Sequence, residues 1–375
     1  MDHRYAALYP SRPAEIELIR DMARGALTAK QKKQLNKEIA QPKPDSKDAF
    51  IMRSASDWLR NGVSTPSPDK LFGDFWYRGE LCILFADTNV GKSILAVQIG
   101  NALASGQPVE VLGAQLQPEP VLYFDFELSG AQFESRYTSN TNGCYTFDRN
   151  FYRVVLNPDA TGAGRFKNYA EYMTNALENI IITSKARTII LDNITCMRSS
   201  TQAAESAITL MRNLQAIKNR YQLSILVLAH TPKRNAGRPI TRNDLQGSKM
   251  LLNFADSAFA IGESQTTAGV RYLKQIKQRS GTQYYGADNV CLCQIIKQGS
   301  FLKFDFTGFD NEATHLMHYT QQQRRSVEER ILLLHNQGHS VRTISAQTNV
   351  YYTSVHRLIK KFQKEELETL NEYGQ

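Results

Sequence analysis

Short apolar segments alternate with longer amphipathic segments between about residues 51 and 310. The apolar segments have the length and composition of buried strands. They are LCILFA (81–86), VLYFDFE (121–127), TIILD (188–192), SILVLAH (224–230) and SAFAIG (257–262). The segments between them have the periodicity of helices. These helices are expected at 92–104, 168–184 and 206–221. The alternation predicts an α/β fold, with a mostly parallel sheet that helices cover on both faces. Hairpin-like strands that extend the sheet are expected at 271–278, 290–296 and 301–309.

The segments outside this alternation predict two further parts of the chain. Residues 12–40 have a helical pattern, and two prolines in QPKPDSKD (41–48) end it and indicate a linker. A third unit begins near Ser326. We therefore expect an N-terminal helical segment and linker at 1–50, an α/β domain at 51–320 and a small all-helical domain at 321–375.

Composition limits the class of protein. Apolar residues make up 42% of the 375 residues and charged residues 22%, which is ordinary for a soluble globular protein. No apolar stretch is long enough to span a bilayer and the N-terminus has no secretion signal, so we expect a cytoplasmic protein. The five cysteines show no CxxC or metal-ligand spacing, which argues against a zinc site or a disulfide framework. The formal net charge of +9 suits a partner that carries phosphates.

The segment ADTNVGKS (86–93) matches the phosphate-binding pattern of Gly or Ala, four residues, and Gly-Lys-Ser. A strand precedes it and a helix follows it, as the chemistry requires, because backbone N–H groups at a helix start wrap around phosphates. Gly91 allows a close approach, Lys92 reaches the β and γ oxygens, and Ser93 offers its hydroxyl to Mg²⁺. We expect ATP and Mg²⁺ as cofactors. The expected nucleotide contacts are Ala86, Thr88, Asn89, Val90, Gly91, Lys92 and Ser93.

Two strands that end in acidic residues are expected beside this loop. TIILD ends in Asp192, which would hold the Mg²⁺ through water. VLYFDFE ends in Glu127, which would polarise the water that attacks the γ-phosphate. Asp125 faces the same side of the strand and is the competing candidate for the base, and one of the two could instead cap the next helix. We favour Glu127, because the terminal residue projects furthest toward the site.

The ordered set of motifs resembles the RecA superfamily, in particular the RepA-like replicative helicase ATPases of plasmids, which are related to DnaB. The resemblance covers about residues 70–300. Besides the P-loop and the strand that ends in Glu127, it rests on LDN (191–193), LAH (228–230) and LQGSKMLLNFADSAFAI (245–261). It implies a RecA-like P-loop core, in which His230 senses the γ-phosphate.

The resemblance also assigns a role to KQRSG (277–281). It implies that Lys277 and Arg279 enter the nucleotide site of a neighbouring subunit, as an arginine finger does. Two residues that are two apart on a strand can point the same way, although a solvated strand edge would have the same pattern. A site completed between subunits implies a closed ring, and we expect a homo-hexamer.

Two loops after the strands that carry Asp192 and His230 would face single-stranded DNA in such a ring. The first, 197–206, is nearly neutral. The second, 231–247, is long and rich in glycine, proline and cations, so we expect it to be mobile until an anion orders it. Its expected DNA contacts are Lys233, Arg234, Arg238 and Arg242.

The segment 326–363 predicts three short helices and resembles the helix-turn-helix of resolvases and transposon proteins. Gly338 marks a turn, and the third helix, at 353–364, would enter the major groove of duplex DNA. The side chains expected to read base edges or meet phosphates are Thr353, Ser354, His356, Arg357, Lys360 and Lys361. A small helical domain with a basic face that binds another protein is the alternative.

A P-loop core together with a helix-turn-helix predicts a DNA-dependent ATPase. We expect a ring-forming, helicase-like motor for replication, mobilisation or transposition of a mobile element. The first alternative is an ATP-switched DNA-binding regulator or recombination accessory protein that does not unwind DNA. The second is a KaiC-like or signalling ATPase whose C-terminal unit binds protein. An α/β ATPase core joined to a helix-turn-helix favours DNA metabolism over signalling.

Overall fold

A computed structural model of the chain describes residues 52, 54–62, 68–109, 112, 116–167, 169–193, 203–232, 234–245, 249–317, 321–348, 350 and 352–373. The chain divides into two units, Met1–Pro66 and Ser67–Gln375, and each is described by itself. In the first unit the structure describes one helix, α3 (Ala55–Gly62), where the Asp57 backbone N–H donates to Ser54 Oγ at 3.1 Å. The helix and linker expected at 12–40 and 41–48 lie outside the described residues.

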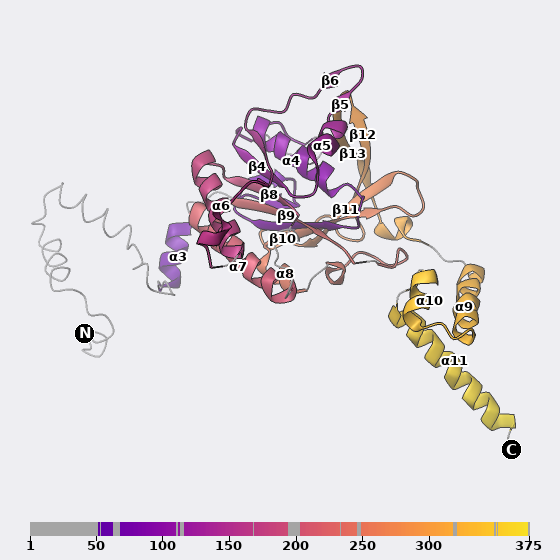
Figure 1. The fold of residues 1–375 in the computed structure, drawn as a ribbon. Coiled ribbons are helices and arrows are strands. Elements are labelled where there is room, and N and C mark those ends of the chain that lie inside the picture. The colour runs from indigo at the N-terminus through magenta and orange to yellow at the C-terminus, as the bar shows by residue number, and fades with distance from the viewer. Residues whose placement is uncertain are drawn as a thin grey trace, which may run out of the picture. The chain divides into compact units, whose positions relative to one another are not determined.

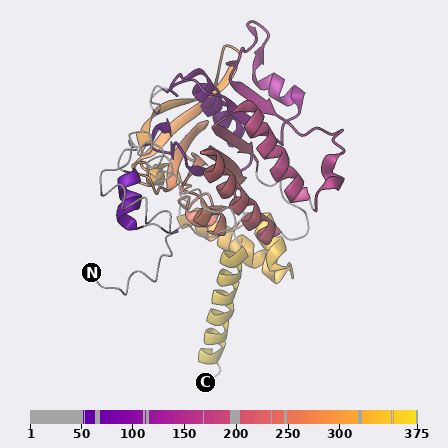
Figure 2. The same ribbon diagram turned by 90° about the vertical axis from the view of Figure 1, so that its left-hand side faces the viewer.

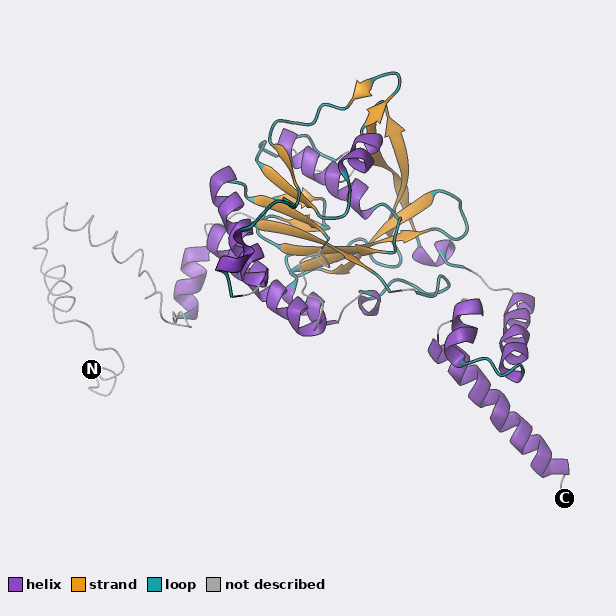
Figure 3. Ribbon diagram, viewed as in Figure 1, coloured by secondary structure: helices purple, strands orange, loops and turns teal. Residues whose placement is uncertain are grey.

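A nine-stranded sheet is the centre of the second unit (Figures 1 and 3), in the order β13-β12-β11-β10-β3-β9-β8-β4-β7. Six neighbouring strands are parallel: β10 (Ser257–Glu263), β3 (Leu81–Ala86), β9 (Ser224–His230), β8 (Thr188–Asp192), β4 (Val121–Asp125) and β7 (Phe151–Val154). Three antiparallel strands extend it: β11 (Val270–Lys277), β12 (Val290–Gln298) and β13 (Phe301–Asp310). The expected mostly parallel α/β fold is confirmed.

Alternate residues of the central strand β3 face two separate hydrophobic clusters. Cys82 and Leu84 face a cluster that includes helix α4 (Lys92–Ser105). Leu81, Ile83 and Phe85 face a cluster that includes α6 (Tyr169–Ser184), α7 (Ala203–Tyr221) and α8 (Lys249–Phe254). Helices therefore cover both faces of the sheet, as expected, with α4 on one side and α6 and α7 side by side on the other (Figures 1 and 2).

Short elements connect the main strands and helices. Two small antiparallel pairs are β1 (Lys70–Phe72) with β2 (Trp76–Tyr77) and β5 (Thr138–Ser139) with β6 (Gly143–Cys144). The other helices among the described residues here are α5 (Gly130–Arg136), η2 (Gly162–Arg165), η4 (Arg242–Asp244) and η5 (Glu312–His315). Cys82, Cys291 and Cys293 are buried side chains, as their apolar segments predict. Within the described segments, no helix is long and apolar enough to cross a membrane.

Three helices form the C-terminal part: α9 (Gln321–Asn336), α10 (Val341–Thr348) and α11 (Tyr352–Tyr373). They enclose a small core of Ile331, Leu334, Ile344, Val355 and Ile359. Gly338 has a φ of 83° at the turn after α9, where a side chain would be strained. The third helix is longer than expected, because the apolar pattern that predicts it ends well before the helix does.

Candidate nucleotide site

The loop between β3 and α4 has the geometry of a phosphate cradle. Gly91 has a φ of 113°, and a Cβ on it would lie 2.7 Å from Ile295 Cδ1 and 2.9 Å from Phe304 Cζ. Only glycine fits this position, because both the backbone conformation and the space exclude a side chain. No side chain caps the start of α4, so the first N–H groups of the helix remain available to an anion. Asn89 (φ 64°) and Thr88 are exposed, whereas Ala86 and Val90 are buried.

Lys92 lies inside this loop and is 6% exposed. Its Nζ donates to the carbonyl oxygens of Ala86 at 3.0 Å and Asp87 at 2.9 Å. Burial lowers the pKa of the ammonium group, while the nearby carboxylates of Asp192, Glu127 and Asp87 act to raise it. The loop therefore holds a desolvated cation, whose positive charge favours binding of a phosphate chain.

Asp192 and Ser93 stand where a magnesium ion would bind. Asp192 is fully buried, its Oδ2 accepts from the Tyr123 hydroxyl at 2.7 Å, and its Oδ1 has no hydrogen-bond partner among the described residues. Burial raises the pKa of this carboxyl to about 6, although the Ser93 and Tyr123 hydroxyls act to lower it. An unpartnered carboxylate oxygen beside a serine hydroxyl fits Mg²⁺.

The described residues contain no group of three or more acidic, histidine or cysteine side chains that could enclose a metal ion alone. Mg²⁺ keeps several waters and is shared between one or two carboxylates and substrate phosphates. The residues of this chain that would hold it are Ser93 and Asp192.

Glu127 and His230 meet across the site. His230 Nδ1 lies 3.2 Å from Lys92 Nζ, and His230 Nε2 lies 3.1 Å from Glu127 Oε1. An ammonium group can only donate, so Nδ1 is the acceptor and Nε2 carries the proton that faces Glu127. This hydrogen-bonded chain joins the lysine expected to bind phosphate to the carboxylate expected to act as the base.

Asn193 is a residue of this cluster to which sequence reasoning gave no role. It is 1% exposed, and its Nδ2 donates to Glu127 Oε1. The same Nδ2 lies 3.0 Å from His230 Nε2, which cannot accept from it when that nitrogen carries the proton. Its sequence signal is the LDN motif (191–193), which supports the family resemblance but gives the asparagine no role of its own.

Asp125, the competing candidate for the base, is held in a different set of contacts. Its Oδ2 accepts from Arg153 Nε at 2.8 Å, and its Oδ1 accepts from the backbone N–H groups of Glu127 at 3.2 Å and Leu128 at 2.9 Å. Arg153 also donates to the Leu128 carbonyl at 2.7 Å and lies over the Phe133 ring. Asp125 and Arg153 therefore hold the backbone of the segment that carries Glu127.

Strand β4 ends at Asp125, so Glu127 lies two residues beyond the strand rather than at its last position. This differs from the expected strand 121–127, because Asp125 ends the ladder by accepting two N–H groups of the following turn. The exposed Glu127 side chain nevertheless reaches His230.

Lys277 and Arg279 lie at the end of the sheet opposite the P-loop. Lys277 Nζ donates to the carbonyls of Leu252 and Ala255, the latter at 2.7 Å. Arg279 lies 3.5 Å from Asp256 Oδ1, and Asp256 Oδ2 accepts from the Leu81 backbone N–H at the start of β3. The P-loop follows the other end of β3, about 17 Å away for a six-residue strand. Neither cation can reach the phosphates of its own subunit.

The cations of the loop after β9 differ in their surroundings. Arg234 is 10% exposed in its side chain and lies 3.5 Å from the carboxylate of Asp87 in the P-loop. Arg238 is exposed, and Arg242 is exposed with its Nε donating to the Ile276 carbonyl at 3.2 Å. Lys233 lies outside the described residues, as does most of the first loop, 197–206.

The described part of the loop contacts a buried ion pair through the backbone of Ile240. The backbone N–H of Ile240 donates to Glu312 Oε1 at 2.8 Å, and its carbonyl accepts from Lys274 Nζ at 2.8 Å. Lys274 and Glu312 are themselves a buried ion pair. Both partners come from distant segments, so loop composition could not reveal the contact.

The C-terminal helices present a basic face on α11. His356, Arg357, Lys360 and Lys361 are exposed, and Ser354 is half-buried. Tyr352 at the start of the helix stacks with His356, with ring centroids 6.3 Å apart. The side chain of Thr353 lies outside the described part. On α10, Ile344 is buried and Ala346 is exposed.

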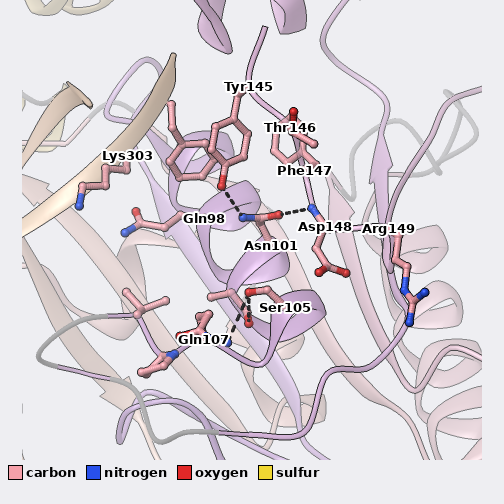
Figure 4. A pocket seen from close by; sticks show the side chains of 14 residues that line it. Gln98, Asn101, Ser105, Gln107, Tyr145, Thr146, Phe147, Asp148, Arg149 and Lys303 are labelled. Atoms are coloured by element: carbon pink, nitrogen blue, oxygen red, sulfur yellow. Dashed lines mark hydrogen bonds between the residues drawn. The ribbon is translucent and has the colours of Figure 1, made fainter. Parts of the chain in front are cut away.

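A separate pocket of about 700 Å³ lies on the outer side of α4 (Figure 4). Asn101 spans it, donating to the Tyr145 hydroxyl at 3.1 Å and accepting from the Asp148 backbone N–H at 3.1 Å. None of the expected nucleotide residues lines this pocket, so the nucleotide site is distinct from it.

A mostly parallel sheet with a phosphate cradle after β3, and an acidic strand end two strands away at β8, defines a P-loop NTPase core of the RecA type. A comparison with protein families matches residues 48–236 to the AAA domain, and the chain belongs to this family. It therefore has an AAA-type, nucleotide-binding P-loop ATPase domain. No curated protein matches the chain.

Proposed function

We propose that the protein is a DNA-dependent ATPase that acts as a ring-forming, helicase-like motor on the DNA of a mobile element. The observation that carries the proposal is the hydrogen-bonded chain from Lys92 through His230 to Glu127, beside the buried carboxyl of Asp192. ATP hydrolysis needs a cation that binds the phosphates, a residue that senses the γ-phosphate and a general base for the attacking water. The three residues proposed for these roles contact one another.

Each residue has a separate task in this chemistry. The N–H groups at the start of α4 and the Lys92 ammonium group bind the phosphates. Ser93 and Asp192 hold Mg²⁺, which when bound neutralises charge that develops on the transferred phosphoryl group. Glu127 orients and polarises the attacking water, and His230, through its Nε2 proton, fixes the carboxylate of Glu127.

Lys277 and Arg279 support a site shared between subunits. Both lie at the end of the sheet opposite their own P-loop, and both contact carbonyl oxygens around the end of α8. In the proposed homo-hexameric ring they supply positive charge to the nucleotide of the neighbouring subunit.

Basic side chains in two places support DNA as the partner. Arg238 and Arg242 are exposed on the loop after β9, which we propose contacts single-stranded DNA in the ring channel. Arg357, Lys360 and Lys361 are exposed on α11, which we propose lies on duplex DNA as the recognition helix of a helix-turn-helix.

The direct test of ATP turnover is Lys92→Ala. The variant should lose turnover by at least about 10²-fold, because Lys92 is the cation at the phosphate position. Lys297→Ala is the matched control, since Lys297 also donates to two carbonyl oxygens but lies on β12. Unchanged turnover in Lys92→Ala would end the assignment.

A strand-displacement assay tests the motor. With ATP and Mg²⁺, the protein should separate a labelled duplex that carries a single-stranded tail, and Glu127→Gln should not. ATP turnover that DNA stimulates without displacement would reject the motor in favour of the regulator, in which nucleotide controls assembly on DNA without unwinding it.

A further inference from the structure

The P-loop of this chain contains an acidic side chain, Asp87, directly after β3. Its Oδ1 accepts from the Thr231 hydroxyl, and its Oδ2 lies 3.5 Å from Arg234 Nε. The Thr231 backbone N–H also donates to the Ala86 carbonyl at 3.1 Å. The start of the P-loop and the start of the loop after β9 are therefore joined by three contacts.

Arg234 is held firmly in this position. Its side chain is 10% exposed, and its Nη1 donates to the Arg238 carbonyl at 2.9 Å, which also fixes the shape of its own loop. The Tyr272 hydroxyl lies close enough for the Arg234 charge to act on it. A guanidinium removed from water to this extent needs a counter-charge, and Asp87 supplies it.

The charge of Asp87 is felt at the phosphate position. Lys92 Nζ donates to the Asp87 carbonyl, and the Asp87 carboxylate acts to raise the pKa of the Lys92 ammonium group. A bare carboxylate there would compete with phosphate for Lys92 and repel the charge of a triphosphate. Arg234 is the cation that the structure places against this carboxylate.

We propose that Arg234 is a positioning residue for nucleotide binding, which neutralises Asp87 so that the P-loop accepts a triphosphate. Arg234 acts through Asp87 and not by touching the phosphates. The ion pair also fixes the loop after β9 to the nucleotide site. The inference rests on the proposed function only in requiring that the P-loop binds ATP.

Equilibrium binding of fluorescent ATP and ADP analogues with Mg²⁺ tests whether Arg234 neutralises Asp87. It is measured for the unchanged protein, Arg234→Ala, Asp87→Asn and the double variant that carries both changes. Arg234→Ala should weaken binding of the triphosphate by about five- to tenfold, and of the diphosphate less, because repulsion grows with ligand charge. Asp87→Asn alone should bind at least as tightly as the unchanged protein. The double variant should bind within about twofold of Asp87→Asn, since no bare carboxylate remains.

Arg220→Ala is the matched control, because it removes an arginine from an ion pair with Glu178 at 2.7 Å on the surface of α7 and should leave affinity unchanged. Arg234→Lys keeps the charge and should bind within about threefold of the unchanged protein, which covers the case that Arg234→Ala does not fold. Rescue in the double variant separates charge balance from a purely structural role.

Three results would overturn the inference: unchanged affinity in Arg234→Ala, no rescue in the double variant, or weakened binding in Asp87→Asn. Failure of the unchanged protein to bind the ATP analogue would instead overturn the proposed function. The two failures are therefore distinguished by the first measurement of the series.

Discussion

The ammonium nitrogen of Lys92 lies 3.2 Å from Nδ1 of His230. The contact links the first turn of α4 to the last residue of β9, two elements that are separated by more than a hundred residues of sequence. Because the other ring nitrogen faces Glu127, we expect a change in the position of Lys92 on phosphate binding to be transmitted to the proposed base. His230 is therefore expected to affect turnover more than binding.

His230→Ala should lower kcat by about tenfold to a hundredfold and change KM by less than about threefold, because the carboxylate of Glu127 loses the group that fixes it. Steady-state ATP hydrolysis at saturating Mg²⁺ measures both constants. His339→Ala, which removes an exposed histidine of the C-terminal part, is the control. A rise in KM at constant kcat would mean that His230 contributes to binding alone.

Glu127→Gln should bind ATP but hydrolyse it about 10²- to 10⁴-fold more slowly, because an amide cannot accept the proton of the attacking water. Single-turnover hydrolysis measures the chemical step. Glu134→Gln on the exposed face of α5 is the matched control. Asp125→Asn should lower stability, because it breaks the contact with Arg153. A folded Asp125→Asn without activity, beside an active Glu127→Gln, would assign the base to Asp125.

The sequence alone predicts two features of this fold: the strands formed by strongly apolar segments, and the P-loop. Strands β3, β8 and β9 are continuous apolar runs, and a phosphate-binding pattern follows β3, so strand order along the chain and the loop geometry follow from local rules. The sequence does not predict strand β7, because FYRV is short and contains a charged residue, Arg153. The structure pairs this arginine with Asp125, a contact that the local pattern does not show.

Contacts between distant segments could not be predicted. Asn193 joins Glu127 across 66 positions, and Glu312 holds the Ile240 backbone across 72. A single sequence gives no measure of such pairing, because local composition reports only on neighbours along the chain. For the same reason, the composition of the loop 231–247 gives no sign of the buried ion pair that contacts its described part.

Asp192→Asn should stabilise the nucleotide-free protein at pH 7. Folding raises the pKa of this carboxyl from 3.8 to about 6, so the folded state binds more protons than the unfolded chain between these values. Stability due to this group is therefore present below about pH 4 and is lost as the pH rises through about 6, at a cost of up to about 3 kcal/mol.

Urea unfolding between pH 4 and 8 measures this effect. The advantage of Asp192→Asn should be largest at pH 7 to 8 and shrink as the pH falls through about 6 toward 4, because the native carboxyl becomes protonated. The exposed Asp159→Asn is the control. The variant should also lose the stabilisation that Mg²⁺ and nucleotide give, because one magnesium ligand is gone. A pH-independent difference would contradict the expected titration.

Lys360→Ala/Lys361→Ala should weaken binding to duplex DNA about equally for all sequences, and the slope of log affinity against log salt should fall by about two. Fluorescence anisotropy at several salt concentrations measures both. Lys185→Ala/Arg187→Ala, which removes two exposed cations after α6, is the matched control. Deletion of 324–375 should weaken duplex binding and leave ATP binding intact. Unchanged duplex binding after the deletion would place the DNA contacts elsewhere.

Mixing Arg279→Ala subunits with Glu127→Gln subunits tests whether the cation acts on the neighbour's nucleotide. Each variant alone should be inactive. In an equal mixture, about a quarter of the subunit junctions pair an intact Glu127 with an intact Arg279, so ATP turnover should return in part. Mixing Glu127→Gln with the double variant Glu127→Gln/Arg279→Ala forms no complete junction and is the control. Activity of Arg279→Ala alone, or a mixture that stays inactive although the subunits assemble together, would reject the shared site, because Arg279 cannot reach the P-loop of its own chain.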